Sequence, residues 1–251
     1  RLQWAGHPID AENRKCLAVT PRRHKRSRIT ALAALTILAV SACGSNMHPG
    51  AAAVVDDTTI SQGKVDDLVL AACDFTRLQR LKQGGAQPSL SVSGLRSNIT
   101  GSLISYAVAH KAADHLHLSI SDSKVGQLMQ AQKLPKGLST SDHELLKEFF
   151  TANTRSQVQQ AVIAEHLKDP SVTSDANVQL SDAQAAADYM KKFTKKQDVV
   201  VNPSYGTWSG TSIDSSSGSL SSPVSSAAKA WAQADGSMQP GPNTPSSQTC
   251  G

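Results

Sequence analysis

Apolar side chains recur every three or four residues over much of the chain, a spacing that predicts amphipathic helices. The first predicted helix follows Ser61, a suitable N-cap, and ends at Gly84-Gly85. A second extends from about Ser93 to His117, and a short third occupies residues 120–135. Each helix has one stripe of mostly apolar residues. In the first helix the stripe consists of Val65, Leu68, Val69, Ala72, Phe75, Leu78 and Leu81. In the second it consists of Leu95, Ile99, Leu103, Tyr106, Ala107 and His110, and in the third of Val125, Leu128 and Met129.

Two further helices are predicted from the spacing of capping boxes, in which a Ser is followed three residues later by Glu or Gln. Ser141 and Glu144 open a helix that continues to Lys168. Ser181 and Gln184 open another, which ends near Lys192. The ten residues between them, 171–180, are predicted as a linker.

Short apolar runs lie at both ends of this helical region. Ala51–Val55 is predicted as a strand, and Thr58–Ile60 can return beside it after an Asp-Asp turn. Val199–Val201 is a third run, near the other end. Each would be an unpaired edge by itself, so pairing the first and third would close the domain. The predicted fold is mainly α-helical, with a small sheet that pairs N- and C-terminal strands.

The segment before this domain has the pattern of a secretory signal. Residues 21–28 are strongly basic, and residues 29–42 contain no charge. These fourteen residues are too few for a membrane span, which needs about 20. They end in Val40-Ser41-Ala42-Cys43, which resembles the lipobox of bacterial lipoproteins. We therefore expect Cys43 to be acylated, and two acyl chains make a stable anchor on the outer face of a bacterial membrane. The alternative is an ordinary signal with a chance cysteine.

The whole pattern predicts four regions. Residues 1–42 form a leader and lipoprotein signal peptide, of which about 1–19 is explained by a start site assigned too far upstream. Residues 43–50 form a tether, and residues 51–208 form the domain. Residues 209–251 are rich in Ser, Pro and Gly, and we expect a disordered tail there.

Three stretches resemble SurA-type foldases, in particular the lipoprotein forms of actinobacteria. The first is AAAVVDDTTISQGKVDDLV, residues 51–69, and the second is the helical middle. The third is DVVVNPSYGTW, residues 198–208, which is similar to the closing strand of that family. Ser204 stands where the family usually has Arg. The residues that carry this closing motif are Asn202, Pro203, Tyr205, Gly206 and Trp208.

This resemblance implies a chaperone that binds unfolded or newly secreted polypeptides in an apolar groove. The full foldases carry a parvulin-type isomerase domain before the last core helix, where this chain has only residues 171–180. The resemblance therefore implies a non-enzymatic protein. Ala107, Met129 and Met190 are candidates for adaptable groove positions, although each can equally be a core residue. Two alternatives remain: a scaffold lipoprotein dedicated to one envelope partner and, more weakly, an active prolyl isomerase.

Charge argues against nucleic acid as a partner. The chain has 25 Lys and Arg against 20 Asp and Glu, but eight of the basic and two of the acidic residues lie in the first 42. The remaining chain is nearly neutral, with 17 basic and 18 acidic side chains. Such a balance does not favour binding to a phosphate backbone.

No catalytic or cofactor motif is apparent, and we expect neither a metal nor a cofactor. His110 and Asp114 are one helical turn apart and could share a metal, but a polar cluster is the better interpretation. His143-Glu144 resembles the start of a zinc-protease motif, but Lys147 stands where that motif requires its second His.

Cys73 and Cys250 would remain after cleavage at Cys43, in an oxidising compartment. A disulfide between them would tie the tail to the first helix. Alternatively, Cys73 is a small buried apolar residue and Cys250 is free.

Overall fold

The computed structural model describes residues 48–85, 89–176, 178–214, 239–240 and 245–250. The chain divides into two units, Arg1–Ala42 and Cys43–Gly251, and every described residue belongs to the second. The predicted signal peptide, the lipobox with Cys43 and most of the tether lie outside the described residues. Those predictions therefore remain predictions.

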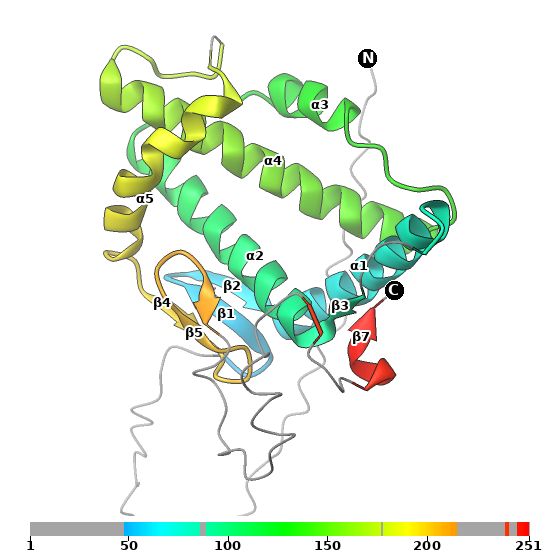
Figure 1. Ribbon diagram of the computed structural model, residues 1–251. Helices are drawn as coiled ribbons and strands as arrows, with labels where there is room; N and C mark the ends of the chain where they lie inside the picture. Colours follow the sequence, from blue (N-terminus) through cyan, green and yellow to red (C-terminus); the bar gives the residue numbers. More distant parts are fainter. Residues whose placement is uncertain (1–47, 86–88, 177, 215–238, 241–244, 251) are drawn as a thin grey trace, which may run out of the picture. The chain divides into compact units, whose positions relative to one another are not determined.

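A three-stranded antiparallel sheet lies at the base of the helices (Figure 1). Its strands are β1 (Ala51–Val55), β2 (Thr58–Ser61) and β4 (Val199–Val201), in the order β2-β1-β4. All five residues of β1 are buried, which explains its uniformly apolar sequence. Asp56 adopts a φ of 51° in the turn between β1 and β2, a conformation that Asp tolerates better than most residues. The predicted closure of the domain by its terminal strands is confirmed.

Between β2 and β4, the described residues form four α-helices, a 3-10 helix and a final short α-helix. They are α1 (Gln62–Lys82), α2 (Val92–His115), α3 (Asp122–Gln130), α4 (Thr140–Lys168), η1 (Leu180–Ala186) and α5 (Ala187–Thr194). The mainly α fold class is confirmed. None of the helices within the described residues has the length and apolar character needed to cross a membrane.

Serine side chains cap the first four α-helices. Ser61, Ser91, Ser121 and Ser139 each accept a hydrogen bond from the backbone N–H three residues later. Ser139 therefore takes the place predicted for Ser141, because the chain turns into the helix two residues earlier and the N–H of Asp142 reaches the Ser139 hydroxyl at 3.1 Å.

The second predicted capping box is wrong. Residues 180–186, which include Ser181 and Gln184, form a 3-10 helix whose N-cap residue, Gln179, makes no side-chain capping bond. The α-helix begins only at Ala187. A capping pair matches the backbone of an α-helical first turn, which this segment does not form.

The core forms where α2 packs against α1, α4, α5 and β1. Its small side chains permit close approach of the backbones, and the buried residues of α2 and α4 include Ile104, Val108, Ala109, Ala112, Val158, Ala161, Val162 and Ile163. The predicted apolar stripe of α1 is wrong at its end. Leu81 is 70% exposed, because the last buried residue of α1 is Thr76 and the final turn of the helix extends beyond the core.

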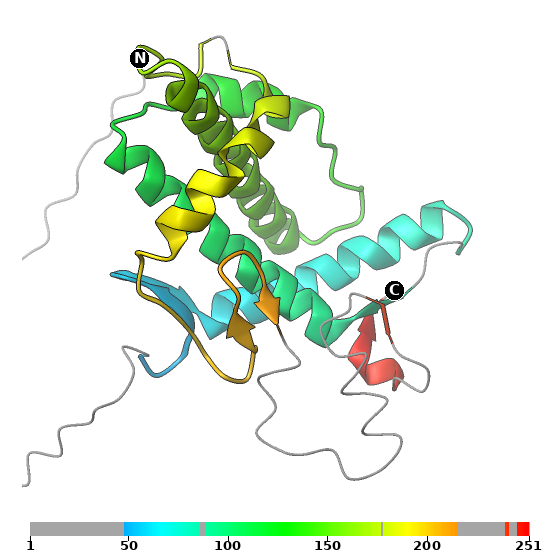
Figure 2. The same ribbon diagram turned by 60° about the vertical axis from the view of Figure 1, so that its left-hand side comes forward.

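Several residues of the predicted tail are folded, so that prediction is wrong for residues 209–214 and 245–250. Strand β5 (Thr207–Trp208) pairs with β6 (Ile213–Asp214), and Ile213 packs against the core. The helical turn η3 (Ser246–Gln248) leads into β7 (Thr249–Cys250), which pairs with β3 (Leu90–Ser91). Figure 2 shows β7 beside α1. Residues 215–238 and 241–244 lie outside the described part.

Candidate functional site

The closing motif joins the two ends of the domain. The Asn202 backbone N–H donates to the Ala52 carbonyl at 2.9 Å, and its side-chain amide donates to the Ala51 carbonyl at 3.2 Å. The Asn202 side-chain oxygen accepts hydrogen bonds from the backbone N–H and the hydroxyl of Ser204, at 3.0 and 2.8 Å. Asn202 thus fixes both β1 and the turn that follows β4. It has a structural role.

The rest of the motif packs the chain onto α2. Tyr205 is buried, and the Ser97 hydroxyl of α2 donates to its carbonyl at 3.2 Å. Burial raises the pKa of the Tyr205 phenol, and the nearby Asp66 carboxylate adds to this effect. Gly206 has a φ of 117°, which favours glycine, and its N–H donates to the Pro203 carbonyl at 3.3 Å.

Trp208 packs against α2 at the position of Gly101. A Cβ built on Gly101 of α2 would lie 3.9 Å from the Trp208 ring and 3.8 Å from the Ile213 backbone nitrogen. These are ordinary van der Waals distances, so an alanine at this position would also fit against the β5–β6 hairpin. The indole N–H is buried without a hydrogen-bond partner among the described residues.

A disulfide joins Cys73 of α1 to Cys250 of β7, with Cα atoms 4.8 Å apart. This is the pairing that the sequence left open. Cys250 is buried in the core, and its partner lies on the helix against which β7 packs. The bond and the β3–β7 pairing together hold the C-terminal residues against the domain.

Two large apolar side chains are exposed on one face of α1. Leu70 is 67% exposed and Leu81 is 70% exposed. They are eleven residues apart, close to three helical turns, so they point in nearly the same direction. About 16 Å separates them along the helix, so they are two single apolar side chains that an extended segment could contact in turn. Leu70 was not among the predicted site residues, because helical spacing alone does not show which apolar side chains remain exposed.

A hollow of about 460 Å³, here the α2–α4 hollow, lies between α2 and α4. Hydroxyl, amide and glycine residues line it, and the β5–β6 hairpin contributes Thr211 to Ile213. This lining differs from the apolar groove that the resemblance implies. Such a surface can donate hydrogen bonds to the backbone of an extended chain but offers little apolar contact.

Two further hollows adjoin the C-terminal half of α2. The β2–α2 hollow has a volume of about 390 Å³, and the α2–α5 hollow has a volume of about 580 Å³. Lys111 and Asp114 line both. Lys111 forms ion pairs with Asp57 and Asp56; its hydrogen bond to Asp57 raises the lysine pKa, and the same bond lowers the pKa of the Asp57 carboxyl.

The three residues considered for an adaptable groove lie on three different helices. Ala107 is buried on α2 and lines the β2–α2 hollow. Met129 lies on α3, where its sulfur accepts a hydrogen bond from the Thr154 hydroxyl of α4 at 3.3 Å. Met190 is half-buried on α5 and packs against the core. None of the three hollows is lined by more than one of them.

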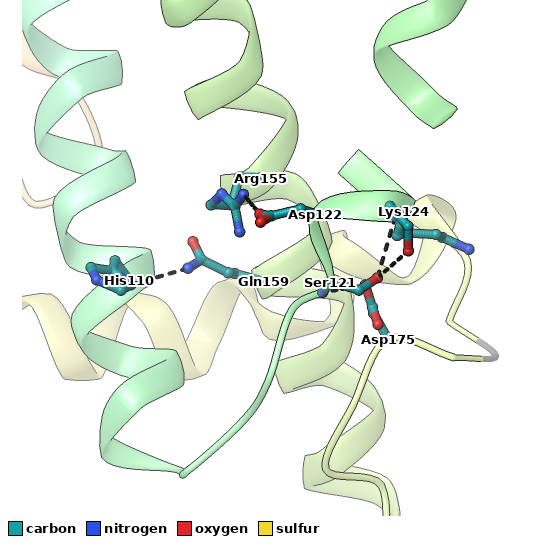
Figure 3. Close-up of polar contacts among 8 residues, drawn as sticks. His110, Ser121, Asp122, Lys124, Arg155, Gln159 and Asp175 are labelled. Atoms are coloured by element: carbon teal, nitrogen blue, oxygen red, sulfur yellow. Dashed lines mark hydrogen bonds and ion pairs between the residues drawn. The ribbon is translucent and has the colours of Figure 1, made fainter. Parts of the chain in front are cut away.

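Polar contacts fix the segment that follows α4 (Figure 3). Asp175, which is buried, accepts hydrogen bonds from the backbone N–H and the hydroxyl of Ser121, at 3.0 and 2.9 Å. Ser119 and Ser174 form an isolated parallel β-bridge nearby. Arg155 of α4 pairs with Asp122 of α3. The predicted linker at residues 171–180 is therefore held against the start of α3.

Figure 3 also shows the contact between the side chains of Gln159 on α4 and His110 on α2. Gln159 is buried, and its side-chain nitrogen lies 3.4 Å from Nδ1 of His110. The other ring nitrogen of His110 lies 3.6 Å from the Asp114 carboxylate. No group of three potential metal ligands occurs among the described residues. The His110–Asp114 pair is thus part of a polar cluster with Gln159.

The family model described as the SurA-like N-terminal domain matches residues 20–156. The chain belongs to this family, whose domain is a chaperone-like module without catalytic function. Neither the curated proteins nor the solved structures contain a match. The closing motif lies beyond the matched residues, and the β1–β4 pairing joins it to them.

Proposed function

We propose that this protein is a lipid-anchored chaperone on the extracytoplasmic face of a bacterial membrane, where it binds unfolded or newly secreted polypeptides. Membership of the SurA-like N-terminal domain family supports the chaperone role. The exposed leucines of α1 are the structural observation that carries it, because unfolded chains are recognised by burial of their apolar side chains.

Two exposed leucines suit weak and unselective binding. Full burial of one leucine contributes about 1.5–3 kcal/mol, from which the cost of ordering the client must be subtracted. Leu70 and Leu81 together can hold an apolar segment briefly and then release it. Polar groups of the α2–α4 hollow would add hydrogen bonds that do not depend on the client's side chains.

Isomerase chemistry is not part of this proposal. In the full foldases the isomerase domain precedes the last core helix, and here residues 171–180 occupy that place. Contacts from Ser119 and Ser121 hold this short segment. A measurable acceleration of proline-limited refolding by the purified protein would contradict this part of the proposal.

The double substitution Leu70→Gln/Leu81→Gln tests the chaperone role. We expect roughly tenfold more of the variant to be needed for the same suppression of aggregation of an unfolded client, because apolar contact is lost. Leu167→Gln is the matched control, since Leu167 is 47% exposed on α4 and should leave suppression unchanged. Equal activity of all three proteins would refute the assigned surface. Absence of suppression by the wild type, with capture of one folded envelope protein, would favour a dedicated scaffold.

The anchor has a separate test. Cys43→Ser in cells should abolish incorporation of labelled palmitate and release the protein from the membrane fraction, because the acyl acceptor is lost. Palmitate incorporation that persists in the variant would exclude Cys43 as the anchor.

A further inference from the structure

The α2–α5 hollow combines aromatic side chains with unpaired positive charge. Phe193 lines the hollow; the Tyr189 ring stacks on it with centroids 6.0 Å apart, and the His115 ring is tilted against it at 5.7 Å. Lys192 lies in α5 and Lys196 in the turn that follows it; both line the hollow and both are exposed. An apolar side chain and an anionic group can therefore be accommodated next to each other.

Basic and acidic side chains occupy different walls of the hollow, with Lys192 and Lys196 on the α5 side and Lys111 and Asp114 on α2. On α2, Lys111 forms ion pairs with Asp56 and Asp57, and Asp114 contributes a carboxylate that lies 3.6 Å from the His110 ring. Within the described part of the chain, neither Lys192 nor Lys196 forms an ion pair. Two positive charges thus remain available at this wall.

Stabilisation of the α5 macrodipole does not by itself explain this arrangement. Lysines near a helix C-terminus are favourable wherever they project around the helix. Lys191 and Lys195 are exposed at the same helix end, yet they do not line the hollow. The concave form of the site also suits a side chain better than a flat membrane surface.

We propose that the α2–α5 hollow binds acidic segments of extended polypeptides. A carboxylate would pair with Lys192 and Lys196, and a neighbouring apolar side chain would cover Phe193 and Tyr189. This inference rests on the proposed function and adds a preference among clients. It predicts that acidic residues next to apolar ones favour capture.

Binding of two labelled peptides to the full chain tests the preference. One peptide carries Glu residues beside Leu and Phe, and the other has Gln in place of each Glu. We expect the wild type to bind the acidic peptide about tenfold more tightly at low salt, with the difference reduced by screening at high salt. Lys192→Gln/Lys196→Gln should remove the difference. Lys191→Gln/Lys195→Gln removes the same charge outside the hollow and should retain it.

Equal affinity of the wild type for both peptides would overturn the proposal, as would equal losses in the two double variants. Suppression of aggregation of an uncharged client separates this inference from the proposed function. That activity should be the same in Lys192→Gln/Lys196→Gln as in the wild type if only the acidic preference resides here. Binding to phosphatidylglycerol vesicles but to neither peptide would instead assign the lysines to a membrane surface and overturn the proposal.

Discussion

Cys73 and Cys250 are 177 residues apart in the sequence, yet a disulfide joins them. The bond constrains the unfolded chain, and we expect Cys73→Ser/Cys250→Ser to lower the free energy of unfolding by about 2–5 kcal/mol. Urea denaturation of the wild type and the variant measures the difference. With a reductant present, the wild type should fall to the stability of the variant. A wild type that is no more stable than the variant under oxidising conditions would contradict a stabilising role.

Asn202 provides a second prediction, because its side chain hydrogen-bonds both β1 and Ser204. Asn202→Ala should lower the free energy of unfolding by about 1–3 kcal/mol, since the Ala51 carbonyl and the Ser204 N–H lose their partner. Ser204→Ala is the control: it removes only one exposed hydroxyl and should change stability by less than about 0.5 kcal/mol. Chemical denaturation of both variants checks this. Equal effects would show that the Asn202 side chain does not stabilise the connection between β1 and the turn after β4.

Local patterns account for what could be predicted of this fold. The strands at Ala51–Val55 and Val199–Val201 follow from apolar runs beside turn residues, and the helices follow from their periodicity. The structured end of the chain could not be predicted in this way. Thr249–Cys250 is a strand only because Leu90–Ser91, far away in the sequence, pairs with it. A composition rich in Ser and Pro gives no sign of such a partner.

The candidate binding surfaces could not be predicted from local patterns either. Helical spacing places Leu70 and Leu81 on one face of α1, but it does not show whether a neighbouring helix covers that face. Lys192 and Lys196 belong to a basic run with two other lysines, and only the packing of α5 against α2 separates the pair that lines the hollow. Periodicity shows direction, whereas exposure depends on tertiary contacts.

Asp175 provides a third prediction, on the segment between α4 and η1. Asp175→Ala should lower the free energy of unfolding by about 1–3 kcal/mol, because the Ser121 N–H and hydroxyl lose a buried acceptor. Thermal unfolding and hydrogen exchange at Ser121 measure the effect. Asp175→Asn retains an acceptor oxygen and should lose less. If Asp175→Ala is as stable as the wild type, the carboxylate does not hold this segment.

Tyr205 provides a prediction on alkaline stability. Burial raises the pKa of its phenol in the folded protein, so the phenol ionises more readily in the unfolded chain, where its pKa is about 10. Its contribution to stability is complete below that value and is lost as the pH rises through the higher folded pKa. Tyr205→Phe has no such group at this position.

The free energy of unfolding should therefore fall more steeply between about pH 9 and 11 in the wild type than in Tyr205→Phe. Denaturation at a series of pH values measures both slopes. Comparing the two proteins at each pH removes the contribution of the lysines, which titrate in the same range in both. Tyr189→Phe is a useful comparison, because burial also raises the pKa of Tyr189. Parallel curves for the wild type and Tyr205→Phe would show that the Tyr205 phenol does not become harder to ionise on folding.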